Sequence, residues 1–63
     1  KENINIQTLN YNGIVETQLF DLLGNNIINS YSRNLSLKDL KKGVYILRIC
    51  YDGNLSEIKI IKN

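Results

Sequence analysis

Short runs of alternating apolar and polar residues fill most of the chain, and Asn, Gly, Asp and Ser separate them. Successive side chains of a strand point to opposite faces, so this alternation is typical of half-buried strands. The second run places Val15, Thr17 and Leu19 on one face. The runs predict strands over residues 3–9, 14–21, 27–33, 35–37, 44–51 and 55–61.

The clearest signal is the strand pair between Gly43 and Ile61. Asp52-Gly53 is a preferred two-residue hairpin turn, and a turn of that length fixes the register. In this register Arg48 faces Glu57, so opposite charges lie directly across the two strands. The strand 44–51 is almost continuously apolar, which predicts a central strand covered on both faces. We expect the core-facing side chains of the pair to be Tyr45, Leu47, Ile49, Ile58 and Ile60.

Two other segments have turn signals. Residues 10–13, Asn10-Tyr11-Asn12-Gly13, are expected to form a turn, because Asn12 and Gly13 both tolerate a positive φ. Residues 37–42 follow Ser36, which together with Asp39 fits a helix capping box, but the helix would have fewer than two turns. A tight turn or a single helical turn is therefore expected there.

Six short strands with turn signals every 8–12 residues indicate an all-β sandwich or a small barrel. The chain has 63 residues, enough for one domain, and a net charge of +2, too small to indicate a nucleic-acid partner. No apolar run has the ~20 residues that a membrane-spanning helix requires, so membrane insertion is not expected.

Candidate catalytic chemistry is sparse. The chain has no His and one Cys, which excludes an imidazole base and an internal disulfide. Cys50 lies within a predicted strand, where a cysteine is usually an inert small hydrophobic residue. A calcium site at Asp21 with Asn25 and Asn26 lacks the spacing of known calcium loops. We therefore predict no catalytic residue, no metal, no cofactor and no enzymatic activity.

Lysines form a basic patch that has two interpretations. Lys38, Lys41 and Lys42 lie in the predicted turn, and Lys59 and Lys62 lie in the last strand. They are either a solvated turn with a charged strand edge that discourages aggregation, or a docking surface for an acidic partner.

Three motifs in order go beyond these general statements. The first is the step Phe20-Asp21-Leu22-Leu23-Gly24, the second is Leu40-Lys41-Lys42-Gly43-Val44-Tyr45, and the third is Lys59-Ile60-Ile61-Lys62. In this order they resemble the type A C-terminal sorting domain of proteins exported by the type IX, or Por, secretion system of Bacteroidota. The resemblance covers essentially the whole chain.

The resemblance implies an Ig-like β-sandwich of about six to seven short antiparallel strands. It implies one sorting domain over 1–63, at the end of a larger secreted protein whose cargo domain comes first. The family usually opens with an Asn-Pro motif that this chain lacks, so we expect the first few residues of the domain to be missing.

The resemblance also implies partners and a destination. The type IX outer-membrane translocon would recognise the domain, and a sortase-like protease would process it. The cargo would pass through the periplasm and the outer membrane to the cell surface or the medium. Candidate translocon-recognition residues, carried over from the motif positions, are Asp21, Gly24, Leu40, Gly43, Tyr45, Lys59 and Lys62.

A second interpretation is a generic β-sandwich accessory domain of a secreted protein, acting as a spacer or binding carbohydrate. Carbohydrate binding needs a row of exposed aromatic side chains, for which Tyr11 and Tyr31 are the candidates.

Overall fold

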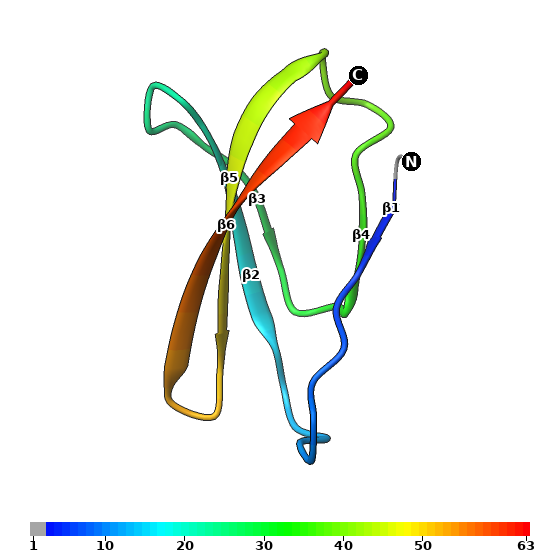
Figure 1. Cartoon of the computed structure of the whole chain (residues 1–63), viewed down its shortest axis with the longest axis vertical. Coiled ribbons are helices and arrows are strands. Elements are labelled where there is room, and N and C mark those ends of the chain that lie inside the picture. Colours follow the sequence, from blue (N-terminus) through cyan, green and yellow to red (C-terminus); the bar gives the residue numbers. More distant parts are fainter. Residues whose placement is uncertain (1–2) are drawn as a thin grey trace.

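The computed structural model describes residues 3–63, which form six strands and no helix. Four strands make one antiparallel sheet in the order β3-β2-β5-β6, and two make a small antiparallel sheet, β1-β4 (Figure 1). The strands are β1 (Asn3–Asn5), β2 (Glu16–Asp21), β3 (Asn26–Ser30), β4 (Asn34–Ser36), β5 (Gly43–Tyr51) and β6 (Asn54–Lys62). These two sheets confirm the predicted all-β sandwich. No membrane-spanning helix is found in the part of the chain that the structure describes.

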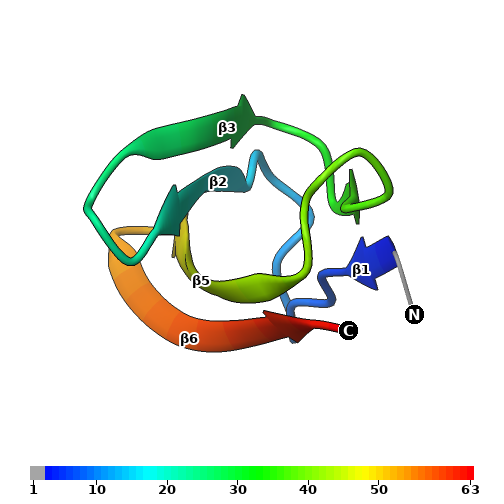
Figure 2. The same ribbon diagram turned by 90° about the horizontal axis from the view of Figure 1, so that it is seen from above.

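The larger sheet is strongly curled, and β1 and β4 lie across its open side (Figure 2). Curling follows from the right-handed twist that accumulates from strand to strand. The hydrophobic core fills the space between the two sheets, so the side chains on the concave face are buried. Its buried members are Leu19, Leu35, Leu37, Tyr45 and Leu47.

Strand β2 supplies the most completely buried face. Val15, just before the strand, is 1% exposed, as is Thr17, and Leu19 is fully buried. This confirms the predicted shared face. The Thr17 hydroxyl donates a 3.3 Å hydrogen bond to the Ser30 carbonyl oxygen, so the buried polar group has a partner.

The β5–β6 hairpin has the predicted register, with Tyr45 opposite Ile60 and Arg48 opposite Glu57. Asp52 and Gly53 have φ values of 50° and 75°, the two positive angles of a type I′ turn. The Arg48 Nη2 atom lies 3.0 Å from the Glu57 Oε2 atom. Turn chemistry and alternation were sufficient to predict this pairing.

The expected coverage of β5 on both faces is wrong. Its concave face is covered, but Val44 and Ile46 on the convex face are only half-buried, because the small sheet covers one side alone. Ile58 is a second correction. It pairs with the buried Leu47, yet 49% of its surface is exposed, because β6 is an edge strand beyond the reach of β1 and β4.

The segment between β1 and β2 differs from the prediction in two ways. The first strand ends at Asn5, and within the predicted turn 10–13 the left-handed residue is Asn10, with a φ of 58°, rather than Asn12 or Gly13. Gly13 leaves room for the Tyr11 ring. A Cβ atom on it would lie 2.5 Å from the Tyr11 hydroxyl oxygen, so the ring would have to shift.

Arg33 holds this segment, a role that sequence reasoning missed. Its guanidinium donates hydrogen bonds to the Thr8 hydroxyl at 2.6 Å and to the carbonyl oxygens of Tyr11 and Gly13 at 3.2 and 3.0 Å. The fork of N–H donors on an arginine suits several acceptors at once. One side chain thus orders a loop that contains no regular strand.

Candidate functional site

Six of the seven candidate residues gather at one end of the sandwich, although they come from three separate segments. We call this end, formed by the β2–β3 turn, residues 37–45 and Lys62, the motif end (Figure 1). Strand pairing brings it together, since Asp21 is the partner of Tyr45 in β2–β5 and Gly43 is the partner of Lys62 in β5–β6. Lys59 lies further along β6, opposite Ile46.

The Asp21 carboxylate organises the β2–β3 turn. Its Oδ1 atom accepts hydrogen bonds from the backbone N–H groups of Leu23 and Asn25, both at 2.9 Å, and its Oδ2 atom accepts one from Asn25 Nδ2 at 3.0 Å. The Asn25 side-chain hydrogen bond, followed by that from the Asn25 backbone, lowers the pKa of Asp21 from its ordinary value of 3.8. Both carboxylate oxygens of Asp21 therefore accept hydrogen bonds from residues of the turn. No cluster of three or more potential metal ligands occurs within residues 3–63.

Gly24 gives this turn its left-handed residue, with a φ of 89°. A side chain there would meet no atom within 4 Å, so the requirement for glycine comes from the backbone angle. The turn displays two leucines that sequence reasoning did not single out. Leu22 is 67% exposed and Leu23 is 88% exposed, which makes the tip of the turn apolar.

Lys62 ties β6 to the turn that precedes β5. Its Nζ atom donates hydrogen bonds to the carbonyl oxygens of Leu37, Lys38 and Leu40, at 2.6, 3.0 and 2.8 Å. An ammonium group has three donors, and all three are used here. The structure therefore gives Lys62 a clear structural role, independent of any partner.

The turn itself is closed by a hydrogen bond from the Leu40 N–H to the Leu37 carbonyl oxygen at 3.0 Å, which confirms a tight turn. The Tyr45 hydroxyl donates to the Lys41 carbonyl oxygen at 2.6 Å, while its ring belongs to the core. Leu40 packs against the same core. Tyr45 and Leu40 thus shape the motif end from inside.

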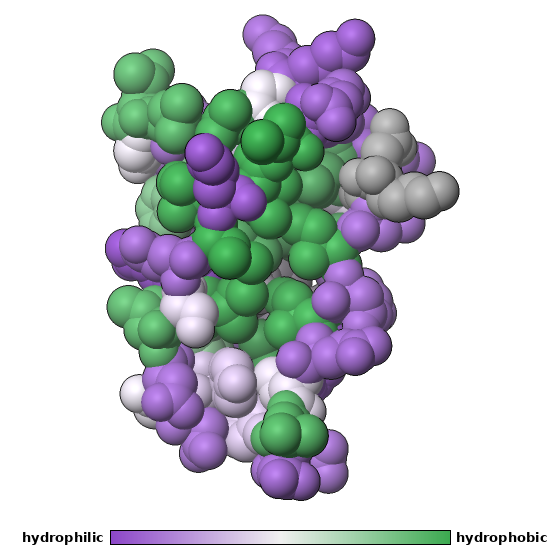
Figure 3. Space-filling view, in the orientation of Figure 1, coloured by the Kyte–Doolittle hydropathy of each residue, from purple (hydrophilic) through white to green (hydrophobic). Residues whose placement is uncertain are grey.

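The exposed surface of the motif end combines cations with apolar side chains. Lys38, Lys41 and Lys42 are exposed there, as is Lys59 further along β6. In Figure 3 apolar side chains gather over β5 and β6 and at the tip of the β2–β3 turn. A groove of about 380 Å³ lies on the convex face beside this turn, lined by Phe20, Asp21, Leu22, Gly24, Ile46, Arg48 and Glu57. In it the Arg48 guanidinium carbon lies 5.3 Å from the centre of the Phe20 ring.

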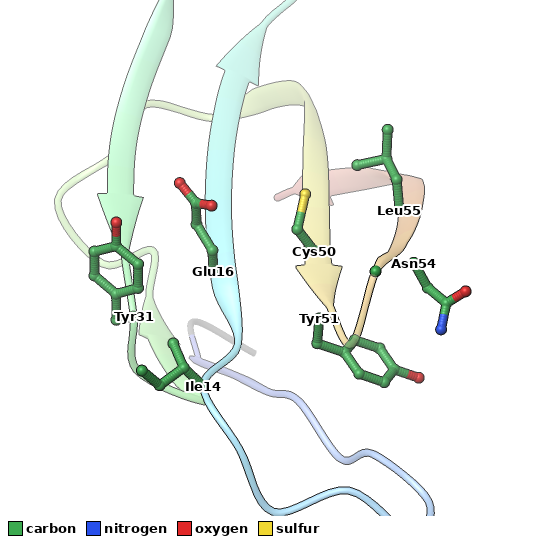
Figure 4. Close-up of a pocket in the computed structure, with 8 residues that line it drawn as sticks. Ile14, Glu16, Tyr31, Cys50, Tyr51, Asn54 and Leu55 are labelled. Carbon is green, nitrogen blue, oxygen red and sulfur yellow. The ribbon is translucent and has the colours of Figure 1, made fainter.

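A second groove, of about 400 Å³, lies at the opposite end of the convex face. Its lining includes Glu16, Tyr31, Cys50 and Leu55, which come from all four strands of the larger sheet or their ends (Figure 4). Glu16 and Cys50 are paired across β2 and β5. The lining of this groove contains no lysine and no arginine.

The two tyrosines considered for carbohydrate binding do not form a row. Tyr31 is 70% exposed, whereas the Tyr11 ring packs against Tyr51, with 5.2 Å between their centres. The Tyr11 hydroxyl also donates to the Ile14 carbonyl oxygen at 2.9 Å. Tyr11 is therefore committed to holding its own loop.

Comparison with known families agrees with the order of the motifs. The family model of the secretion system C-terminal sorting domain matches residues 1–63. The chain belongs to this family. No curated protein and no solved structure matches it.

The sorting domain is a C-terminal signal for type IX secretion. The family is a non-catalytic one, and membership implies interaction with the type IX secretion machinery and an N-terminal cargo domain. Membership implies export to the cell surface or the medium. The conclusion confirms the targeting interpretation and gives no support to the accessory-domain alternative.

Proposed function

We propose that the motif end is the surface by which the type IX translocon recognises this sorting domain. The observation that supports this proposal is the convergence of Asp21, Gly24, Gly43, Tyr45 and Lys62 at one end of the fold.

The candidate residues divide into two kinds. Asp21, Gly24, Tyr45 and Lys62 have their polar groups or backbone angles committed to the two turns, so they set the shape. The groups left for a partner are the exposed leucines of the β2–β3 turn and the neighbouring lysines. A partner that binds here would present an apolar pocket with acidic groups at its rim.

The finer parts of the proposal follow from the family. Residues 1–63 act as one sorting domain at the end of a larger secreted protein, which crosses the periplasm before the outer membrane. The translocon binds the folded domain without inserting it into the membrane. A sortase-like protease then separates it from the cargo.

A matched pair of leucine variants tests the recognition surface. Leu23, in the β2–β3 turn of the motif end, and Leu9, in the segment between β1 and β2, are both 88% exposed. The chain is fused to the C-terminus of a fluorescent protein that carries an inner-membrane export signal, in a host with type IX secretion. We expect Leu23→Ser to leave most of the reporter in the periplasm, and Leu9→Ser to be exported like the wild type.

Equal export of both variants would contradict the proposed surface while leaving the sorting function intact. Periplasmic retention of the unmodified fusion would instead contradict the sorting function of this chain. Thermal unfolding of both purified variants is the control, because exposed leucines contribute little to stability.

A further inference from the structure

Strand β6 presents a long free edge. It pairs with β5 on one side and with no strand on the other among the described residues. In the hairpin closed by Asp52-Gly53, Tyr51 and Asn54 form the first hydrogen-bonded pair, so every second residue of β6 bonds to β5. The intervening residues direct their backbone N–H and C=O groups outward. They are Leu55, Glu57, Lys59 and Ile61.

The side chains of these four residues are complementary to those of the same strand running antiparallel to it. In an antiparallel pairing centred on Ile58, Glu57 lies opposite Lys59 of a second copy, and Lys59 lies opposite its Glu57. Leu55 and Ile61, which are 59% and 61% exposed in the single chain, lie opposite each other at both ends of the pairing. Opposite charges and apolar pairs placed directly across strands stabilise a sheet.

Neighbouring two-fold registers lack this match. Centring the pair on Glu57 places two glutamates opposite each other, and centring it on Lys59 places two lysines opposite each other, which destabilises the pairing. The register centred on Ile58 also uses the full length of β6, because Asn54 and Lys62 are equidistant from its centre. One register is therefore favoured over its neighbours.

We propose that β6 is a homodimerisation edge, at which two copies of this chain pair antiparallel about Ile58 into one continuous eight-stranded sheet. The pairing covers Ile58, which is 49% exposed on the concave face of the single chain. It also places Glu57 between Arg48 of its own chain, already 3.0 Å away, and Lys59 of the second copy. The contact is isologous, so it closes at two copies.

Charge variants test the partner and the register together. Sedimentation equilibrium of the 63-residue chain up to about 1 mM should show a monomer–dimer equilibrium. Lys59→Glu alone and Glu57→Lys alone each place like charges opposite each other twice, so each should weaken dimerisation at least about tenfold. A 1:1 mixture of the two variants restores both opposite-charge pairs and should dimerise like the wild type.

Several outcomes would overturn the proposal. The wild-type chain could stay monomeric up to about 1 mM, or it could form assemblies larger than a dimer. The Lys59→Glu variant could dimerise like the wild type. The 1:1 mixture of the two charge variants could stay monomeric. A domain-swapped dimer would be recognised by dimerisation of the Lys59→Glu variant like the wild type, because exchanged β6 strands would not place residues 57 and 59 opposite each other.

Cross-linking tests the register directly. Ile58 and its counterpart would form a non-hydrogen-bonded pair with Cα atoms about 4.5 Å apart, which is suitable for a disulfide. In a Cys50→Ala background, Ile58→Cys should form a cross-linked dimer under mild oxidation. Ser56→Cys is the matched control, because residue 56 of each copy faces residue 60, about 13 Å along the strand from its own counterpart. Cross-linking of the control alone would overturn the register.

Discussion

The Nζ atom of Lys62 lies 2.6 Å from the carbonyl oxygen of Leu37, 25 positions earlier in the chain. This contact joins the end of β6 to the turn that leads into β5. Because Lys62 also bonds the carbonyl oxygens of Lys38 and Leu40, the shape of that turn depends on β6. Lys62, the last position of the terminal motif, is thus a structural link within the motif end.

Removal of the Lys62 ammonium should destabilise the domain. Lys62→Met keeps the aliphatic stem but leaves three carbonyl oxygens without their donor, and we expect a loss of about 1–3 kcal/mol in the free energy of unfolding. Urea denaturation at low micromolar concentration measures it. Lys59→Met is the control, since Lys59 makes no ion pair within the described chain, and its effect should stay within about 0.5 kcal/mol. Equal losses in both variants would contradict the role of Lys62.

Arg33 should be the most important cation for the segment between β1 and β2. Arg33→Met removes its hydrogen bonds to Thr8, Tyr11 and Gly13, and we expect a loss of about 1.5–3 kcal/mol in unfolding free energy. Arg48→Met breaks an ion pair whose side chains are 40% and 51% exposed, and should cost about 1 kcal/mol or less. A larger loss at Arg48 than at Arg33 would contradict this ranking.

The Asp21 carboxyl should titrate below its ordinary pKa of 3.8 in the folded domain. Its pKa is lowered on folding, so its contribution to stability is present above pH 3.8 and is lost as the pH falls through the folded pKa. The NMR titration of the side-chain carboxyl carbon measures the midpoint. Asn25→Ala removes the largest cause of the shift and should raise the midpoint towards 3.8. An unchanged midpoint in this variant would exclude the Asn25 side chain as the cause.

The cost of replacing Gly24 should depend on how readily the new residue adopts a positive φ. Gly24→Ala forces a side chain into the left-handed region and should cost about 1–2 kcal/mol of unfolding free energy. Gly24→Asn should cost less, because Asn adopts this conformation more readily. Thermal unfolding distinguishes the two variants, and equal stability of both would show that φ is not what selects glycine here.

Local patterns predicted the strands and the hairpin well. Alternation identified the buried face of β2, and Asp52-Gly53 fixed the β5–β6 register, because both depend on neighbouring residues. The pattern could not show which strand forms the sheet edge. Edge position depends on contacts between segments far apart in the chain, which is why Ile58 was predicted to be more buried than it is.

The candidate site could be predicted only as a set of residues. The motifs identified Asp21, Gly43 and Lys62, but their meeting at one end required the β2–β5 and β5–β6 pairings. The hydrogen bonds of Lys62 and Arg33 left no local signal, because their acceptors are backbone carbonyl oxygens, which every residue has. A side chain that satisfies distant backbone is recognised only in the folded structure.

The hydrogen bonds from Lys62 to the 37–40 turn also mean that this turn is completed only after β6 has been synthesised. A ribosome delivers the N-terminal parts of a chain first, so β6 emerges after the other strands of this domain. Until Lys62 arrives, the turn lacks three of its hydrogen bonds and β5 lacks its outer neighbour. A cargo protein whose translation stopped before β6 would therefore carry an incomplete sorting domain.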